Sequence, residues 1–443
     1  MTFSSATLGE YLFKLWLMPP EDELPTGDNV VPPIDRVGEL LCDEPDISPE
    51  RLRALLELSV GKAIEQHERV GLFLSGGLDS STIAMLVKRS GKQMIAGTFR
   101  YGDAALEYEG ISDDYKFTKL VCEREGIELL TVNAEVKDLE SLSELVRFMD
   151  SPIADPAIIP SYLVAKRIAR EADVVLSGHG GDELFGGYET YRIAIKEDTY
   201  GKLIPRAFFL LMQQFAEFMQ SIRTDGSKTK FYRDLARFAQ GAQYSFPFNH
   251  ECFRSYFSVS EINRLVGSDA WLETYFEKIG RYVSFAERSI SRLQVLQILD
   301  LYGTLQSHNL AYTVSACNAA NIEVKFPIIN EDIITYCLSI PDKRKMHGKQ
   351  YKLILREAMR DILPKEILQR TPAGFAMPIR YWFSKNLGAA VDLLTTRNAR
   401  IKSYLDADEI ENILSSHVKG KSDNAMKIWA LLTLELYLQH KRC

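Results

Sequence analysis

The sequence predicts an α/β protein with a doubly wound parallel sheet and a large, mainly helical C-terminal portion. Short apolar runs with the length of buried strands recur through the first half of the chain, at residues 70–74, 94–99, 128–132 and 173–177. Helical patterns separate these runs, and such alternation is typical of parallel strands joined by right-handed crossovers. Beyond residue 191 strand patterns become rare and helical periodicity dominates, which predicts the helical portion.

The first predicted strand leads through a glycine turn into a helix. The apolar run Val70–Leu74 is followed by Ser75-Gly76-Gly77, and a helical pattern starts after Asp79. Glycines let backbone N–H groups approach a phosphate, and a helix N-terminus adds partial positive charge. The motif SGGLDSS directly after a buried strand therefore favours a phosphate site over an ordinary strand-to-helix turn. Asp79 offers a carboxylate to a metal on that phosphate, and hydroxyl donors stand at Ser75, Ser80 and Ser81.

A second predicted strand ends in a second glycine loop. Residues 173–177 run directly into Gly178-His179-Gly180-Gly181-Asp182. Ligands of open α/β sheets bind where neighbouring strands end at their carboxyl side, so we expect the two loops to face one site. Asp79 and Asp182 would then share one Mg²⁺ ion that bridges the triphosphate oxygens of a nucleotide.

These two loops resemble the signatures of a known enzyme family. SGGLDSS resembles the pyrophosphate-binding loop of the ATP-pyrophosphatase (PP-loop) enzymes, and SGHGGDELFGGY resembles the second signature of the asparagine synthetase family. The resemblance implies an adenine nucleotide alpha hydrolase-like fold, ATP as a substrate and Mg²⁺ as its ion. Family members activate a carboxylate as an acyl-adenylate, release pyrophosphate and transfer the acyl group to ammonia or another amine. The ATP contacts that the resemblance implies are Leu74, Ser75, Gly76, Gly77, Asp79, Ser80, Ser81, Thr98, Ser177 and Gly178.

One position of the second loop departs from the family. Asparagine synthetases carry Glu, and the related β-lactam synthetases carry Tyr, where this chain has His179. This position faces the acyl-adenylate in those enzymes, so the resemblance implies that His179 deprotonates or orients the incoming amine. An unperturbed histidine pKa near ~6.5 suits a general base at neutral pH; the alternative is that His179 only packs within its loop. We predict His179, Asp79 and Asp182 as catalytic residues, and the departure leaves the aspartate-to-asparagine reaction open.

Later motifs place further charges near this site. Residues 350–357 resemble a family helix in which Lys352 and Arg356 stand one turn apart, so we expect both to project from one face, towards phosphate, substrate or solvent. Arg370 opens a stretch that resembles the family's Gly-Phe loop, and Pro372 stands where active members carry a lysine near the α-phosphate. A missing cation at developing charge costs about 3 kcal/mol or more. Arg370, Lys352 or a neighbouring lysine would therefore replace that cation, or activity is weakened.

The motifs divide the chain into three predicted parts. Residues 1–47 form an appendage whose amphipathic helix, at Leu8–Trp16, we expect to dock on the main body. Residues 48–200 form the nucleotide-binding core, and residues 201–443 form the mainly helical synthetase portion. We expect the aromatic residues of this last part to be core residues, because they recur at helical spacing: Phe208, Phe209, Phe215, Phe218, Phe231, Tyr232 and Phe238.

The start of the chain bears on the source of nitrogen. Glutamine-using asparagine synthetases begin Met-Cys and carry a glutaminase domain first, whereas position 2 here is Thr2 and too few residues precede the first strand for such a domain. The donor would then be free ammonia, a separate glutaminase subunit or another amine. The alternative is that the chain is a fragment of a longer protein.

Composition narrows the partners and the compartment. The chain has 443 residues, 46% of them hydrophobic, and a net charge of −7, which suggests neither a nucleic acid nor a membrane as partner. Six scattered cysteines without a CxxC pair, and the absence of a signal-peptide pattern, predict a cytoplasmic protein. A homodimer is a candidate assembly.

Together these features predict an ATP-dependent carboxylate–amine ligase that forms AMP and pyrophosphate, with aspartate and ammonia as the default substrates. The nearest alternative is an amide or β-lactam synthetase of specialised metabolism, with the same chemistry on another carboxylate. An alternative of another class is a non-catalytic nucleotide-binding or partner protein, which Pro372 in place of the family lysine favours.

Overall fold

One five-stranded parallel sheet organises the structure, a computed structural model that describes residues 3–17, 31–32, 36–41, 46–109, 114–200, 204–221, 226–284, 290–370 and 377–441. The strands are β1 (Arg69–Phe73), β2 (Gln93–Arg100), β3 (Glu128–Asn133), β4 (Val174–Leu176) and β5 (Glu323–Lys325). Their order is β3-β2-β1-β4-β5, so the chain winds outward from β1 first to one side and then to the other. This is a doubly wound sheet, and the predicted fold class is confirmed. The fifth strand was not predicted.

The central strand β1 is buried on both faces. It pairs with β2 and with β4, and Leu72 stands opposite both Ala96 and Leu176. The parallel strands β1 and β4 therefore end at the same edge of the sheet, and the chain leaves both strands there. On one face a side chain at Gly97 would come within 2.6 Å of Val164. The missing side chain lets α8 (Ile158–Ile168) pack close to the sheet.

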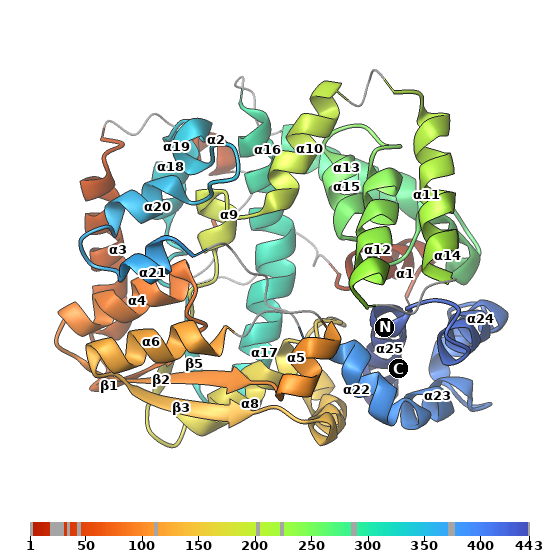
Figure 1. The fold of residues 1–443 in the computed structure, drawn as a ribbon, viewed down its shortest axis with the longest axis horizontal. Helices are drawn as coiled ribbons and strands as arrows, with labels where there is room; N and C mark the ends of the chain where they lie inside the picture. The colour runs from red at the N-terminus through yellow and green to blue at the C-terminus, as the bar shows by residue number, and fades with distance from the viewer. Residues whose placement is uncertain are drawn as a thin grey trace.

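Helices cover both faces of the sheet. Figure 1 shows α4 (Leu78–Arg89) and α6 (Tyr115–Glu125) on one face, and α3 (Pro49–Ile64) packs beside α4. The other face is covered by α8 and α17 (Ala311–Ala319), whose apolar side chains form a separate core with β2 and β4. Ser48 is the N-cap of α3, since its hydroxyl accepts the N–H of Arg51 at 3.2 Å.

Shorter elements connect the strands of the core. They are α5 (Asp103–Glu109), η3 (Val136–Ser141), α7 (Leu142–Leu145), η4 (Val146–Phe148), α9 (Gly181–Phe185) and α10 (Glu189–Tyr200). Residues 136–148 are thus divided among three short helical pieces.

The second half of the chain is helical, as predicted. Its elements are α11 (Arg206–Ser221), α12 (Gly226–Gly241), α13 (Phe248–Arg254), α14 (Val259–Val266), α15 (Ala270–Ser284), α16 (Arg292–Asp300), the π-helix η6 (Leu301–Leu310), α18 (Glu331–Ser339), α19 (Asp342–Lys345), α20 (Leu353–Ala358), α21 (Lys365–Leu368), α22 (Ile379–Asn386), α23 (Gly388–Thr395), η7 (Arg400–Ser403), α24 (Ala407–Val418) and α25 (Ala425–His440). Figure 1 shows α16 and α17 between the sheet and the helices α11 to α15. Among the described helices, none has the length and hydropathy that a membrane span requires.

Four of the aromatic residues predicted to lie in the core are exposed instead. Phe208, Phe215, Phe218 and Phe231 leave between 54 and 62% of their surface to solvent. The buried face of α11 is formed by Phe209 and Ala216. Helical spacing shows that a stripe is apolar but not which stripe meets the body of the protein, so this prediction was wrong for the four.

The predicted N-terminal helix is confirmed as α1 (Ser5–Lys14), and it docks on the helical half. Tyr11 donates to the carbonyl of Ala430 at 2.7 Å. Lys14, at its end, forms a buried ion pair with Glu251 of α13. The four-residue helix α2 (Val37–Leu40) follows before α3.

Candidate active site

The first glycine loop joins β1 to the N-terminus of α4. Gly76 has a φ of 66°, and a side chain there would come within 2.5 Å of the backbone N of Thr118 at the start of α6. Ser75 folds back onto the helix: its N–H donates to the Ser80 hydroxyl at 3.2 Å, and the two hydroxyls lie 3.0 Å apart. The N-cap, Gly77, has no side chain to satisfy the first N–H groups of α4. These donors therefore remain available to an anion.

The second glycine loop lies directly against the first. A side chain at Gly178 would come within 2.9 Å of the backbone N of Ser80, and one at Gly181 would overlap the Asp79 carboxylate. Gly180 has a φ of 95°, which favours glycine, and it is the N-cap of α9. Both loops leave paired strands at the same edge of the sheet. The two loops therefore lie in contact at this edge, and that they bind one ligand stays a prediction.

Lys352 lies between the two carboxylates that were predicted to share a metal. Its ammonium is 2.5 Å from Asp79 Oδ2 and 2.8 Å from Asp182 Oδ1. Burial acts to lower the pKa of Lys352, but Asp182 and Asp79 raise it above its usual value, so the side chain is charged. Burial also raises the pKa of Asp79, although Lys352 opposes that shift. The site is thus a cation between two acidic groups.

The same carboxylates fit a divalent cation. Asp79 Oδ1 is buried and has no hydrogen-bond partner among the described residues, and Asp182 is 38% exposed in its side chain. Carboxylate oxygens are the ligands that Mg²⁺ prefers, and phosphate oxygens complete such sites. The carboxylates of Asp79 and Asp182 therefore fit the predicted Mg²⁺ ion. The sequence indicated no further ligand for this ion among the described residues.

His179 is held at both ring nitrogens. Nδ1 lies 2.6 Å from the Ser177 hydroxyl, and Nε2 lies 3.2 Å from the hydroxyl of Tyr312 on α17. Burial lowers the pKa of His179 to about 4. This effect outweighs Asp155 and Asp182, which act to raise the pKa. The ring is therefore neutral at physiological pH and can accept a proton only transiently.

Three further residues near His179 were missed. Asp155 lies 2.8 Å from His308 Nε2, and the indole of Trp16 stacks on the His308 ring with centroids 4.1 Å apart. His308 Nδ1 and Trp16 Nε1 are buried without a hydrogen-bond partner among the described residues. Trp16 follows α1, Asp155 lies in the segment before α8, and His308 belongs to the π-helix η6. The three residues are therefore distant in sequence. The spacing of His308 and Tyr312, four residues apart, was the only signal available.

The remaining predicted ATP contacts lie at the edge of this site. Leu74 and Thr98 are buried at the ends of β1 and β2, and the carbonyl of Leu74 accepts the Thr118 hydroxyl at 3.3 Å. Ser81 is fully buried, and its hydroxyl has no partner among the described residues. Ser177 contacts His179, as described above.

The predicted cations Lys352, Arg356 and Arg370 are placed differently from one another. Lys352 precedes α20 with a φ of 55°, so it does not share a helical face with Arg356, and that expectation was wrong. Arg356 donates to the carbonyls of Tyr351, Leu368 and Arg370. Arg370 donates to the carbonyl of Ser75 at 3.3 Å and pairs with Asp114. Pro372 lies outside the described residues.

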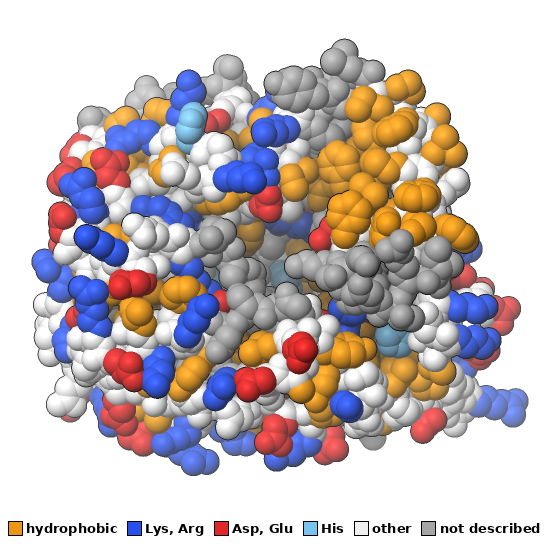
Figure 2. Space-filling model, in the orientation of Figure 1, with side chains coloured by type: hydrophobic (Ala, Val, Ile, Leu, Met, Phe, Trp, Pro, Cys, Tyr) orange, Lys and Arg blue, Asp and Glu red, His pale blue; other side chains and the backbone are white. Residues whose placement is uncertain are grey.

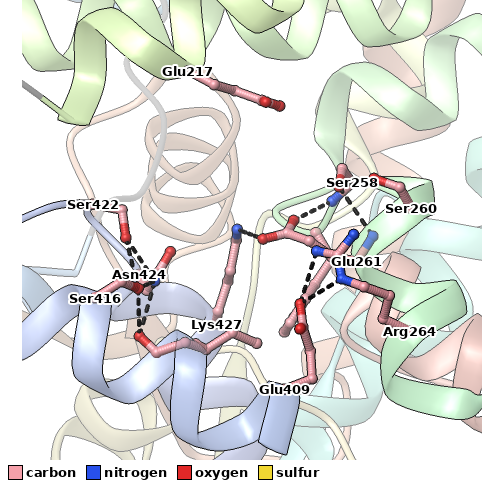
Figure 3. Close-up of polar contacts among 12 residues, drawn as sticks. Glu217, Ser258, Ser260, Glu261, Arg264, Glu409, Ser416, Ser422, Asn424 and Lys427 are labelled. Carbon is pink, nitrogen blue, oxygen red and sulfur yellow. Dashed lines mark hydrogen bonds and ion pairs between the residues drawn. The ribbon is translucent and has the colours of Figure 1, made fainter.

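A polar cavity of about 760 Å³ lies elsewhere, and none of the predicted site residues lines it. Its walls come from α11, α12, α14, α24 and α25. Figure 3 shows the ion pairs that join these walls: Lys427 with Glu261 at 2.5 Å, and Arg264 with Glu409 at 2.8 Å. The same view shows Asn424 hydrogen-bonded to Ser416 and Ser422. These contacts tie the C-terminal helices to the helical half.

Comparisons with known proteins identify similar chains. A family model described as asparagine synthase matches residues 51–439. The chain is 27% identical over 398 residues to asparagine synthetase (glutamine-hydrolyzing) 1 of Bacillus subtilis (strain 168), covering 89% of this chain and 60% of that protein. It is 28% identical over 398 residues to a putative asparagine synthetase (glutamine-hydrolyzing) of Mycobacterium bovis, covering 88% of this chain and 57% of that protein. The chain thus spans about 60% of the length of these curated relatives.

Proposed function

The chain belongs to the asparagine synthase family, and from this premise we propose that it is an ATP-dependent, amide-forming carboxylate–amine ligase. The observation that carries the proposal is the contact between the two glycine loops, which places Asp79 and Asp182 around one cation position. The uncapped N-terminus of α4 beside them supplies donors for phosphate oxygens.

The proposed reaction has two steps. A carboxylate oxygen of the substrate attacks the α-phosphorus of ATP, and pyrophosphate leaves. The amine nitrogen then attacks the acyl carbon, AMP leaves, and the amine's proton is taken up by His179. Asp79 and Asp182 would hold Mg²⁺, which supplies charge neutralisation of the triphosphate when bound. Arg370, which contacts Ser75, lies where it can support the phosphate loop.

The structure offers a reason for His179 to act in the second step. A neutral imidazole can take a proton from an ammonium-like intermediate, and Tyr312 at 3.2 Å holds the ring in place. The network of Asp155, His308 and Trp16 lies beyond it. A histidine with these neighbours differs from the glutamate that asparagine synthetases carry at the position of His179. An amide synthetase that acts on another carboxylate is therefore the second candidate. Aspartate with ammonia remains the default.

The nitrogen source and the compartment are also proposals. The matched relatives are named as glutamine-hydrolyzing enzymes, and we infer that ammonia or another amine reaches this chain free, from a separate glutaminase subunit or from a preceding domain. The four cysteines described by the structure are free, which supports a reducing cytoplasmic location.

Exchange of labelled pyrophosphate into ATP tests the first step. We expect exchange that depends on one acid from a panel of carboxylates, and we expect Asp79→Ala and Asp182→Ala each to abolish it. Asp173→Ala, which removes an exposed carboxylate at the start of β4, is the matched control and should exchange normally. No exchange with any acid, while ATP still binds, would favour a non-catalytic nucleotide-binding protein.

A separate measurement tests His179. We expect His179→Ala to retain pyrophosphate exchange but to slow amide formation about 100-fold, within the usual range for loss of a general base. An equal loss in both steps would contradict a role directed at the amine.

A further inference from the structure

The polar cavity whose wall residues appear in Figure 3 is a second concave site of this protein. Its volume of about 760 Å³ lies within the range of small-molecule sites, which is about 300–1,000 Å³. The helices α11, α12 and α14 form one part of its wall, and α24 and α25 form the other. None of the residues placed in the proposed reaction lines it, so a ligand bound here would have a role of its own.

The helix α11 turns a polar stripe towards this cavity. Figure 2 shows hydrophobic side chains gathered over the region that α11 and α12 occupy in Figure 1. By contrast, Gln213, Glu217 and Gln220 line the cavity and recur at intervals of four and three residues, which places them on one face of α11. On α12, Arg233 and Arg237 line the cavity one turn apart. A polar stripe on a helix whose outer face is apolar indicates a wall that faces a polar ligand.

Cations outnumber acidic groups in the wall of the cavity. Six cationic side chains line it, against four acidic ones. The whole chain has the opposite balance, with a net charge of −7. A concave surface with an excess of one sign of charge concentrates ligands of the other sign, so this cavity favours an anion.

Three of the four acidic groups already have cationic partners. Figure 3 shows two of these ion pairs, which were described above. In the third, Asp423 lies 2.9 Å from the guanidinium of Arg233 and 2.9 Å from that of Arg380. The fourth acidic group, Glu217, accepts a hydrogen bond from the amide of Gln213 at 2.9 Å. Three of the cations, in contrast, have no carboxylate partner among the residues that the structure describes: Arg237, Lys419 and Lys421.

Arg237 is held in a position that leaves N–H groups available. Its guanidinium carbon lies over the Tyr256 ring, 4.0 Å from the ring centre. Stacking fixes the plane of a guanidinium and leaves its edge free for the two parallel hydrogen bonds that a phosphate accepts. One turn before it, Arg233 Nε is buried and has no hydrogen-bond partner among the described residues. A buried donor of this kind is costly unless a ligand or a water molecule satisfies it.

The other two cations stand on the turn between α24 and α25. Gly420 lies between them with a φ of 67°, and the N–H of Lys421 donates to the carbonyl of Ser416 at 2.8 Å. The side chains of Ser422 and Asn424 hydrogen-bond within the same turn, as described above. The turn is therefore ordered by its own hydrogen bonds, and it presents two lysine side chains that are exposed to solvent.

Three cations without acidic partners, on two parts of one wall, match a ligand with more than one negative charge. A phosphate group carries about two charges near neutral pH, and it accepts hydrogen bonds from both arginine and lysine. We propose that this cavity binds a small organic phosphate, with its phosphate groups held by Arg237 and by the turn that carries Lys419 and Lys421. Sugar phosphates and nucleotides share this chemistry and are the two sources of such a ligand.

Titration calorimetry with two probes tests this site. Fructose bisphosphate represents the sugar phosphates and AMP the nucleotides, and we expect the wild type to bind at least one of them with micromolar affinity. The double variant Lys419→Gln/Lys421→Gln should bind that probe at least about 10-fold more weakly, because charged hydrogen bonds are lost. Lys343→Gln/Lys385→Gln is the matched control, since both lysines are exposed and neither lines the cavity. This control should bind the probe as tightly as the wild type.

The comparison separates this cavity from the site at the glycine loops. AMP is a product of the proposed reaction and can bind there too, but such binding would be equal in the wild type and in the double variant. Equal affinity in these two proteins for each probe would overturn the proposal, and so would binding of neither probe at millimolar concentration. A loss of affinity in the double variant supports the proposal whether or not the chain exchanges pyrophosphate.

Two substitutions of Arg237 test the contribution of α12. Arg237→Gln should weaken binding about as much as the double variant does, and Arg237→Lys should recover only part of the affinity. The reason is that lysine keeps the charge but lacks the planar fork that binds phosphate through two hydrogen bonds. Circular dichroism checks that both variants are folded. Wild-type affinity in a folded Arg237→Gln would overturn the proposed site, because the phosphate would then not be held by α12.

Discussion

Lys352 illustrates how one side chain joins two loops from distant parts of the chain. Its ammonium lies within 2.8 Å of both Asp79 and Asp182, and its backbone has a φ of 55°, a conformation that non-glycine residues rarely adopt. Such a conformation costs about 1–3 kcal/mol and persists only where the surroundings enforce it. Here the two ion pairs enforce it, because a cation in this position offsets the repulsion between the carboxylates.

The variant Lys352→Met should therefore unfold more easily without Mg²⁺. We expect a loss of about 2 kcal/mol in the free energy of unfolding, below the full cost of breaking a buried pair because Asp182 is partly exposed. Mg²⁺ should restore more stability to this variant than to the wild type, since it can occupy the same position. Urea unfolding with EDTA and with Mg²⁺ measures both effects. Lys349→Met, at an exposed site, is the control; equal Mg²⁺ effects in all three proteins would contradict a shared cation position.

At the scale of elements, the geometry of the candidate site depends on glycines, which have no side chain. The loop after β4 approaches the start of α4 because Gly178 and Gly181 have no Cβ in the way. The loop after β1 approaches α6 for the same reason at Gly76. Strand ends bring the loops to one edge of the sheet, but the glycines determine how closely the two carboxylates come together.

Gly181→Ala tests this dependence. The new methyl group would overlap the Asp79 carboxylate, so Asp79 must move away from Asp182 and Lys352. We expect ATP affinity, measured by calorimetry, to fall at least 10-fold, and stability to fall by about 1–3 kcal/mol.

Gly61→Ala is the matched control for this substitution. Gly61 lies within α3, and a Cβ there meets nothing within 4 Å. This variant should bind ATP normally and gain up to about 1 kcal/mol in stability. Wild-type ATP affinity in Gly181→Ala would show that loop contact does not set the geometry of the site.

At the scale of the whole molecule, a buried ionic network joins the N-terminal helix to the helical half. Lys14 of α1 pairs with Glu251, and Asp300 accepts from Arg254 at 2.6 and 2.8 Å and lies 3.3 Å from His250 Nε2. Ligand atoms of His250, Glu251 and Asp300 lie within 4.8 Å of one another, as in a metal site. Both carboxylates already have cationic partners, however, so the cluster is better described as a structural network.

His250 makes the stability of the fold depend on pH. It is fully buried, and burial together with Arg254 lowers its pKa to about 4 from an unfolded value of 6.5. Between these values the unfolded chain binds a proton that the folded protein does not, so stability falls as the pH drops from about 6.5 to 4. The contribution of this residue is at most about 3 kcal/mol.

Urea unfolding at pH 7.5 and pH 5 measures this effect. We expect His250→Gln to show a smaller difference between the two conditions than the wild type, because glutamine does not titrate. His67→Gln is the control, because it removes another histidine, whose Nε2 lies 3.1 Å from Lys325 Nζ and 3.8 Å from the Glu323 carboxylate. An unchanged pH dependence in His250→Gln would exclude this residue as the cause.

The parts of the fold and site that the sequence predicted are those encoded locally. Residues 69–81 and 174–182 each contain a complete strand, turn and helix start, so both loops were predicted with their carboxylates. Tyr312, Asp155 and Trp16 were missed because their relation to His179 exists only after α17, the segment before α8 and the N-terminal helix have packed together. The exposed Phe215 was misjudged for a similar reason, since periodicity does not reveal which stripe of a helix is covered.

By itself, the sequence determined the fold class, the two phosphate-loop candidates and the family resemblance, because buried strands, glycine turns and helix starts depend on neighbouring residues. The tertiary structure alone decided that Lys352 lies between Asp79 and Asp182, that Tyr312 holds His179, and that one face of α11 remains exposed. These features depend on contacts between segments more than a hundred residues apart or on the absence of such contacts, and their energies arise only when the chain is compact.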